Sequence, residues 1–89
     1  MRAEIDLHEM TVIEAQVALN QLIDSLGWEY DEILVVHGYH SGILQNFVRT
    51  QYRHKRVKQI ILSLNPGDTS LLLRSRQEMA EEKKKHRKK

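Results

Sequence analysis

Hydrophobic and polar residues alternate at the start of the chain and then change to a helical spacing. Residues 3–8 alternate with a period of two, which predicts a short strand that carries Asp6 and His8 on the same face. Thr11 and Glu14 then have the spacing of a capping box, and the apolar residues after them recur every three or four positions. This spacing predicts an amphipathic helix of about four turns.

The rest of the chain repeats the change from strand to helix and then adds two strands. Residues 33–36 are a continuous apolar run, which is typical of a strand buried on both faces, and a second helix is expected over 43–54. A third strand is expected over 57–64, a turn over 65–68 and a short fourth strand over 70–73. The order β-α-β-α-β-β predicts an α/β domain with a four-stranded mixed sheet and two helices.

Two polar motifs follow the first two predicted strands. Asp6 and His8 close the first strand, and His37 and Gly38 come directly after the second. A strand–helix–strand unit of this length favours two parallel strands, whose carboxyl ends meet at one edge of the sheet. We therefore expect the two motifs, about thirty residues apart, to form one site.

The charges are unevenly distributed along the 89 residues. Residues 1–48 hold one basic and eight acidic residues, whereas 49–58 hold five basic residues and no acid. The tail 75–89 is also basic and is expected to be helical or disordered after a single domain over 1–74. This asymmetry favours a polyanionic partner such as nucleic acid over a merely solvated surface.

The composition also limits the cellular setting. The chain has no cysteine, so disulfides and thiolate metal sites are excluded. Its first residues lack the apolar run of a signal peptide, and no segment is long enough to span a membrane. We expect an intracellular protein, cytoplasmic or nuclear, without a membrane partner.

Each motif has a functional and a structural interpretation. A carboxylate beside an imidazole suits general acid–base catalysis, whereas the spacing alone favours Asp6 and His8 as caps of the turn that follows. Glycines before a helix let backbone amides approach a phosphate, although the loop could be an ordinary connection. Basic and aromatic side chains further along could contact phosphates or stack on bases. The candidate nucleic-acid-binding residues are Gly38, Tyr39, Ser41, Gly42, Arg49, Arg53, Lys55 and Arg56.

A metal site is the remaining chemical possibility. Asp6, His8, His37 and His40 could converge and supply nitrogen and oxygen ligands. No pair of them has the i, i+4 spacing of a zinc-binding helix. No structural metal is predicted, and a catalytic divalent ion stays open.

Three motifs resemble the Smr (small MutS-related) domain family over residues 4–73. Ile5-Asp6-Leu7-His8 is similar to the family's Leu-Asp-Leu-His-Gly opening. The segment from Val35 to Leu44 is similar to its second motif, His-Gly-x-Gly-x-Gly-x-Leu, and 66–70 to its closing Gly-Ala-Thr segment. Three motifs in the family's order are more specific than any one of them.

The resemblance implies a fold similar to the C-terminal domain of a bacterial translation initiation factor. It also implies nucleic-acid binding, often with endonuclease activity on DNA in repair or recombination, or on RNA, including messenger RNA on stalled ribosomes. Asp6 and His8 match the motif tied to cleavage, and His37 or His40 would protonate the leaving oxygen or steady the phosphate. Such a domain is expected to act as a monomer.

The sequence departs from the family pattern at three positions. Glu9 replaces the glycine after the first histidine, and Tyr39 and His40 replace a basic residue and the middle glycine of the second motif. Glu9 brings a negative charge to a site that would bind phosphate. The alternative to an endonuclease is therefore a non-catalytic module that binds nucleic acid, or an adaptor whose basic tail docks on ribosomal RNA.

Overall fold

The computed structural model describes residues 1–39 and 42–87, except for the side chains of 83–87. The elements follow one another as β1 (Arg2–Asp6), α1 (Val12–Ser25), β2 (Glu32–Val36), α2 (Gly42–Asn46), the π-helical segment η1 (Phe47–Gln51), β3 (Val57–Leu62), β4 (Asp68–Leu73) and α3 (Arg76–Arg87). The predicted β-α-β-α-β-β order is confirmed. The helix α3 adds to it at the carboxyl end.

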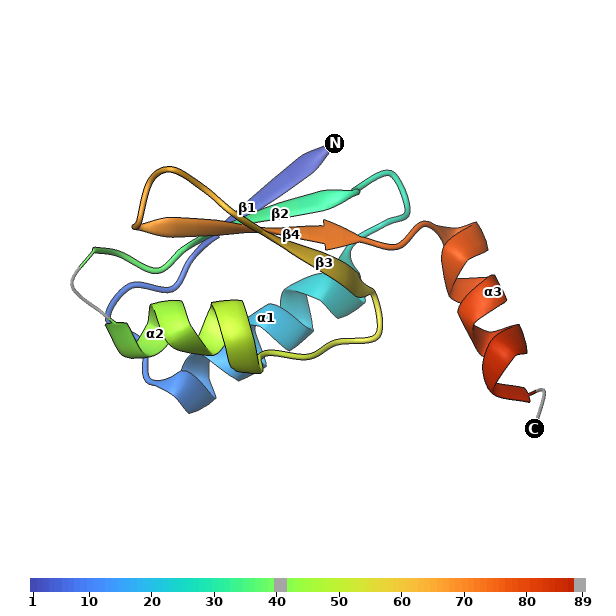
Figure 1. The fold of residues 1–89 in the computed structure, drawn as a ribbon, viewed down its shortest axis with the longest axis horizontal. Helices are drawn as coiled ribbons and strands as arrows, with labels where there is room; N and C mark the ends of the chain where they lie inside the picture. Colours follow the sequence, from blue (N-terminus) through green and yellow to red (C-terminus); the bar gives the residue numbers. More distant parts are fainter. Residues whose placement is uncertain (40–41, 88–89) are drawn as a thin grey trace.

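The four strands form one mixed sheet in the order β1-β2-β4-β3. The strand β1 runs parallel to β2, and β4 lies between β2 and β3 and is antiparallel to both. The carboxyl ends of β1 and β2 therefore meet the beginning of β4 at one end of the sheet. The carboxyl end of β4 and the helix α3 lie at the opposite end, as Figure 1 shows.

The helix α1 connects the two parallel strands and begins as its sequence predicts. The Thr11 hydroxyl accepts from the Glu14 backbone N–H, and the Glu14 carboxylate accepts from the Thr11 backbone N–H, which completes a capping box. The helix buries Ala15, Leu19 and Ile23, which lie at the four-residue spacing of a core-facing stripe.

The second helix changes its hydrogen bonding halfway along. Its last turn is π-helical, and the Tyr52 backbone N–H donates to the Phe47 carbonyl at 2.8 Å, five residues back. The rings of Phe47 and Tyr52 then meet edge to face with their centroids 5.8 Å apart. The Tyr52 hydroxyl donates to Asn20 Oδ1 of α1, and burial raises the pKa of Tyr52 to about 12. Tyr52 is thus a core residue, not a surface for stacking bases.

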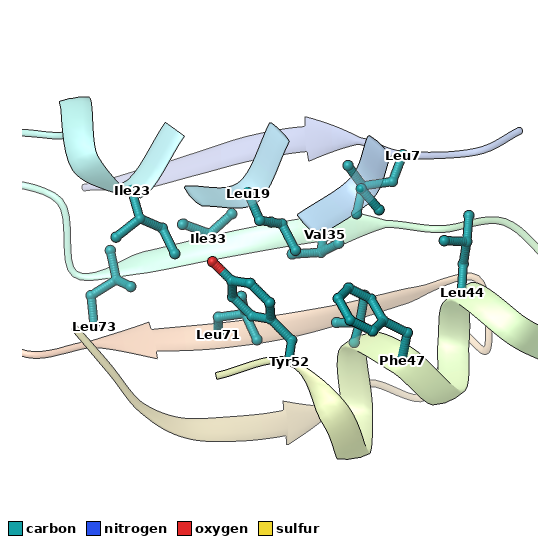
Figure 2. Packing of buried hydrophobic residues seen from close by; sticks show 12 residues of the cluster. Leu7, Leu19, Ile23, Ile33, Val35, Leu44, Phe47, Tyr52, Leu71 and Leu73 are labelled. Carbon is teal, nitrogen blue, oxygen red and sulfur yellow. The ribbon is translucent and has the colours of Figure 1, made fainter. Parts of the chain in front are cut away.

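The core lies between one face of the sheet and the two helices α1 and α2, which lie side by side on that face (Figure 1). Figure 2 shows side chains from both layers pointing toward one another. The buried apolar residues are Leu7, Ala15, Leu19, Ile23, Ile33, Val35, Leu44, Phe47, Val48, Tyr52, Leu71 and Leu73. Ile33 and Val35 alternate with half-buried neighbours along β2, so only one face of that strand is fully covered.

Several element boundaries differ from the sequence prediction for local reasons. The first strand ends at Asp6, because residues 7–10 form a turn closed by the Met10 N–H and the Leu7 carbonyl. The second helix ends at Gln51. The strand β3 ends at Leu62, two residues before the predicted end. The next residue, Ser63, donates its hydroxyl to the Asp68 carboxylate in the turn that leads to β4.

The basic tail is helical at its start. Ser75 and Glu78 exchange side chain–backbone hydrogen bonds in a second capping box, from which α3 begins. The Glu78 carboxylate also pairs with Lys58 Nζ of β3 at 2.8 Å, which anchors the first turn of α3 to the sheet. Among the described helices, none combines the length and the apolar character needed to cross a membrane.

Candidate functional site

The structure brings the two predicted motifs together at the carboxyl ends of β1 and β2. Asp6 is in register with Val36, and the Leu7 backbone N–H donates to the Val36 carbonyl at 2.7 Å. A Cβ atom placed on Gly38 would lie 3.6 Å from the Cβ atom of His8. The predicted convergence of the two segments at one edge is therefore confirmed.

Asp6 and His8 form a hydrogen-bonded pair at this edge. His8 Nδ1 lies 2.7 Å from Asp6 Oδ1, and the His8 backbone N–H donates to the same oxygen at 3.0 Å. Both side chains are more than half exposed. Within the described part of the chain, His8 Nε2 has no hydrogen-bond partner, so solvent or a substrate can reach it. Below, we call these two residues the Asp6–His8 pair.

The pair shifts the ionisation of both members. The hydrogen bonds from the His8 backbone and then its side chain lower the pKa of Asp6. The hydrogen bond to Asp6 and its charge raise the pKa of His8. Because the Asp6 carboxylate is ionised and can only accept, His8 Nδ1 carries the proton in this bond. Neutral His8 therefore keeps the lone pair of Nε2 toward solvent.

Glu9, next in the chain, has a backbone conformation that favours glycine. Its φ is 70°, which is the left-handed region that side chains with a Cβ rarely adopt. The tight turn after β1 imposes this φ, because the Met10 N–H must return to the Leu7 carbonyl. This conformation supplies a physical reason for a glycine at the position, which the sequence pattern alone did not.

His37, by contrast, is fully buried. Its Nε2 lies 2.9 Å from the Thr69 hydroxyl, and its Nδ1 lies 3.3 Å from the Gly38 carbonyl. The backbone N–H groups of His37 and Gly38 both donate to the Gly67 carbonyl. With both ring nitrogens engaged by the protein, His37 does not fit the expected role of protonating a leaving oxygen. It fits a residue that positions the loop after β2.

Thr69 and Arg49 complete a chain of contacts to His37. Arg49 Nε donates to the Thr69 hydroxyl at 2.8 Å, and Arg49 Nη2 donates to the Asp68 carbonyl at 3.1 Å. Burial chiefly lowers the pKa of His37, and the nearby Arg49 charge lowers it further. Neutral His37 can donate from Nδ1 to Gly38 and accept at Nε2 from the Thr69 hydroxyl.

Sequence reasoning did not single out Thr69, although it lies in the third motif. Its role depends on the pairing of β2 with β4, which places Thr69 beside Val35, close to the end of β2. The signal in the sequence was the likeness of 66–70 to the Gly-Ala-Thr segment. That likeness identified the strand but not the contact with His37.

Tyr39 lies on the exposed side of the same edge. Its side chain is 68% exposed, and its ring lies 3.5 Å from the point that a Cβ on Gly67 would occupy. A Cβ at position 67 would therefore be in ordinary van der Waals contact with the Tyr39 ring. Gly42 begins α2 with open space around its Cα. The expected site residues His40 and Ser41 lie outside the described residues.

The basic candidates separate into three environments. Arg53 and Lys55 are exposed. Arg49 is half-buried against β4, as described above. Arg56 is only 4% exposed, and its guanidinium donates to the carbonyls of Leu26, Gly27, Tyr30 and Arg74. The expectation that Arg56 contacts nucleic acid does not fit this burial.

Arg56 instead fastens the turn between α1 and β2 to the rest of the domain. Its guanidinium also stacks on the ring of Trp28, with Cζ 4.5 Å from the ring centroid. Burial lowers the pKa of Arg56. The missed signal was the position of Arg56 directly before β3, where its side chain reaches the carbonyl of Leu26 at the end of α1.

The described side chains do not form a metal-binding group. Among residues 1–39 and 42–82, no three His, Asp or Glu side chains lie together in a way that could hold an ion. Asp6 and His8 bond to each other, and the His37 ring faces Thr69. We therefore derive no chemical step through a metal.

Comparisons with known proteins agree with the motifs. The model of the Smr domain family matches residues 5–69 of this chain. Among solved structures, the chain is similar to the Smr domain of Thermus thermophilus MutS2, with 28% sequence identity and a TM-score of 0.70. The match covers 81% of this chain and 98% of the MutS2 domain. No curated protein sequence matches.

Proposed function

This chain belongs to the Smr domain family, and from that premise we propose that it binds nucleic acid at the edge formed by β1, β2 and β4 and cleaves phosphodiester bonds there. The observation that carries the proposal is the Asp6–His8 pair. It presents an oriented imidazole to solvent at the carboxyl ends of two parallel strands, where ligands commonly bind in such sheets.

The proposed chemistry assigns one role to each member of the pair. His8 Nε2 takes a proton from water or from a ribose 2′-hydroxyl, and the resulting oxygen attacks phosphorus. The bond from phosphorus to the leaving oxygen breaks, and that oxygen takes a proton from solvent. Asp6 fixes the imidazole ring and stabilises the imidazolium that forms.

Surrounding groups support binding in this proposal. The exposed Tyr39 ring, which lies against Gly67, offers a face on which an unpaired base can stack. Gly38 has a φ of 88° and no side chain, so the backbone leaves room next to His8. The contacts from Arg49 through Thr69 to His37 hold this loop in place.

A panel of substrates tests the proposal. Single- and double-stranded DNA and RNA are incubated with the wild-type protein, Asp6→Ala and His8→Ala, each with and without a chelator. We expect the wild type to cleave at least one substrate and both variants to lose that cleavage. Equal cleavage by all three proteins would contradict the proposed role of the pair, and the chelator arm reports whether a metal takes part.

A second candidate is a module that binds without cleaving. It is favoured by the buried state of His37, which leaves His8 as the one imidazole that the described residues present at this edge. Glu9 adds a negative charge beside it. Salt-dependent binding to oligonucleotides without product from any of the four substrates would support this alternative over the nuclease.

A further inference from the structure

A groove lies between the exit of η1 and the first half of β3, away from the Asp6–His8 pair. It is lined by the polar side chains of Arg53, His54, Lys58 and Gln59 together with the apolar Val57 and Ile60. Arg53 and Lys58 are both exposed, but Lys58 Nζ is paired with Glu78, so among the described residues Arg53 is the groove cation without a carboxylate partner. The function proposed above makes no use of it.

A β-bulge in β3 shapes this groove. Val57 pairs with Leu73 and Gln59 pairs with Leu72, so Lys58 is an extra residue without a partner on β4. Bulges in edge strands redirect a side chain and interrupt further strand pairing. Because β3 is at the edge of the sheet, the bulge points Lys58 away from the ladder and into the groove wall.

Further cations surround the groove at this end of the molecule. Arg74, at the exit of β4, donates to the carbonyls of Lys55 and Val57, which ties the segment before β3 to the segment before α3. The Arg74 backbone N–H donates to the Arg56 carbonyl. Lys55, in the segment before β3, and Arg76, at the start of α3, are both exposed. Basic side chains therefore come from three neighbouring segments at this end of the sheet. Carboxylates accompany them, since Asp24 bonds to His54 at 2.9 Å and Glu78, Glu81 and Glu82 lie around Arg74.

We propose that this groove binds the phosphodiester backbone of a nucleic acid whose other part lies at the Asp6–His8 pair. The inference rests on the proposed function and adds a second contact to it. The first half of β3 and the carboxyl ends of β1 and β2 lie at opposite ends of the sheet (Figure 1), so the length of β4 separates the groove from the pair. Six residues of β4 span about 20 Å, which corresponds to about six base pairs of duplex rise.

The Glu78 carboxylate would compete with a phosphate for Lys58, one of the two cations of the groove. Its oxygens lie 2.8 and 3.0 Å from Lys58 Nζ, so a phosphate must share or displace it. Substituting glutamine for Glu78 removes this competition and preserves the capping box of α3, because glutamine also serves at that position. If the groove binds phosphate, Glu78→Gln therefore strengthens binding.

Fluorescence anisotropy with labelled single- and double-stranded RNA and DNA of about 20 nucleotides tests the inference, since that length exceeds the sites of small single-strand-binding folds. The double variant Arg53→Gln/Lys58→Gln is compared with the wild type over a range of salt concentrations. Arg2→Gln is the matched control, because Arg2 is exposed at the same end of the sheet but on the opposite edge strand.

We expect the double variant to bind severalfold more weakly and to lose about 0.7 from the salt slope for each cation removed. Glu78→Gln should bind more tightly than the wild type, and Arg2→Gln should match it. If the wild type binds and the double variant has the same affinity and the same salt slope, the groove does not bind the nucleic acid. The proposed function would not be affected by this result. Failure of the wild type to bind any of the single- and double-stranded probes at low salt would overturn the proposed function and the groove together.

Discussion

At the scale of single residues, Glu9 is the position where this chain and its family differ most clearly in physical terms. The turn after β1 holds Glu9 at a φ of 70°. A non-glycine residue in this region costs about 1–2 kcal/mol. The family glycine at this position thus has a conformational reason, and this chain retains the turn at a cost in stability.

We therefore predict that Glu9→Gly stabilises the domain by up to about 1 kcal/mol, after allowing for the greater freedom of glycine in the unfolded chain. Urea unfolding of the variant beside the wild type measures the change. Glu9→Gln is the control, because it removes the charge and keeps the strain, so its stability should stay close to that of the wild type. A Glu9→Gly variant no more stable than Glu9→Gln would contradict the role of the backbone conformation.

The pKa values of the two histidines of the site are predicted to shift in opposite directions. The hydrogen bond to Asp6 raises the pKa of His8 above its ordinary value of about 6.5, whereas burial lowers the pKa of His37 below it. NMR titration of the two imidazoles measures both values. In Asp6→Asn the His8 pKa should fall toward the ordinary value while that of His37 stays unchanged. A His8 pKa that does not respond would show that the pair does not form in solution.

The His37 shift also predicts how stability depends on pH. Its folded pKa lies below its unfolded pKa, so the unfolded chain binds more protons in the interval between them. Its contribution to stability is present above the unfolded pKa and is lost as the pH falls through the folded pKa. His8 has the opposite sign: its contribution is present at low pH and lost as the pH rises through its raised pKa.

At the scale of elements, the strand β4 links the site to the second helix through Thr69. The Thr69 hydroxyl is the common partner of His37 Nε2 and Arg49 Nε. We predict that Thr69→Val, which keeps the shape and removes the hydroxyl, destabilises the domain by about 1–3 kcal/mol, because a buried nitrogen loses its partner. Chemical unfolding checks this value.

Thr69→Ser distinguishes the contribution of the Thr69 hydroxyl from that of its methyl group. It keeps both hydrogen bonds and loses only a buried methyl, which is worth about 0.8 kcal/mol. The His37 resonance should keep its titration in Thr69→Ser and change in Thr69→Val. If Thr69→Val proves as stable as Thr69→Ser, the hydroxyl does not hold His37.

The same element explains what the sequence could and could not predict. The convergence of Asp6 and His37 was predictable, because parallel strands joined by a helix bring their carboxyl ends together. The burial of His37 was not, since its partner Thr69 lies 32 residues further along and reaches it through the β2–β4 pairing. The π turn that brings Tyr52 into the core likewise gives no periodic signal.

At the scale of the whole molecule, Arg56 joins segments that are otherwise distant in the chain. It holds the turn over 26–30 against the exit of β4 through four carbonyls and the Trp28 ring. Charge patterning grouped it with the exposed cations, because a run of basic residues does not show which member is enclosed by carbonyl oxygens. The structure encloses Arg56 and leaves Arg53 and Lys55 exposed.

We predict that Arg56→Lys destabilises the domain by about 3 kcal/mol or more, because lysine has a single amino group and leaves several buried carbonyls without donors. Arg53→Lys is the matched control and should change stability by no more than about 0.5 kcal/mol, since Arg53 is exposed. Urea unfolding of both variants measures the difference. Equal stability of the two would contradict the structural role of Arg56.

The central claim is that the Asp6–His8 pair cleaves the nucleic acid that the rest of the edge binds. Its most direct test measures cleavage and binding on the same His8→Ala sample, with the substrate on which the wild type is most active. His8 is exposed, so its loss should leave the fold intact. We predict that cleavage is lost while affinity for the substrate stays within a few fold of the wild type. Cleavage that survives in His8→Ala, with binding intact, would contradict the claim.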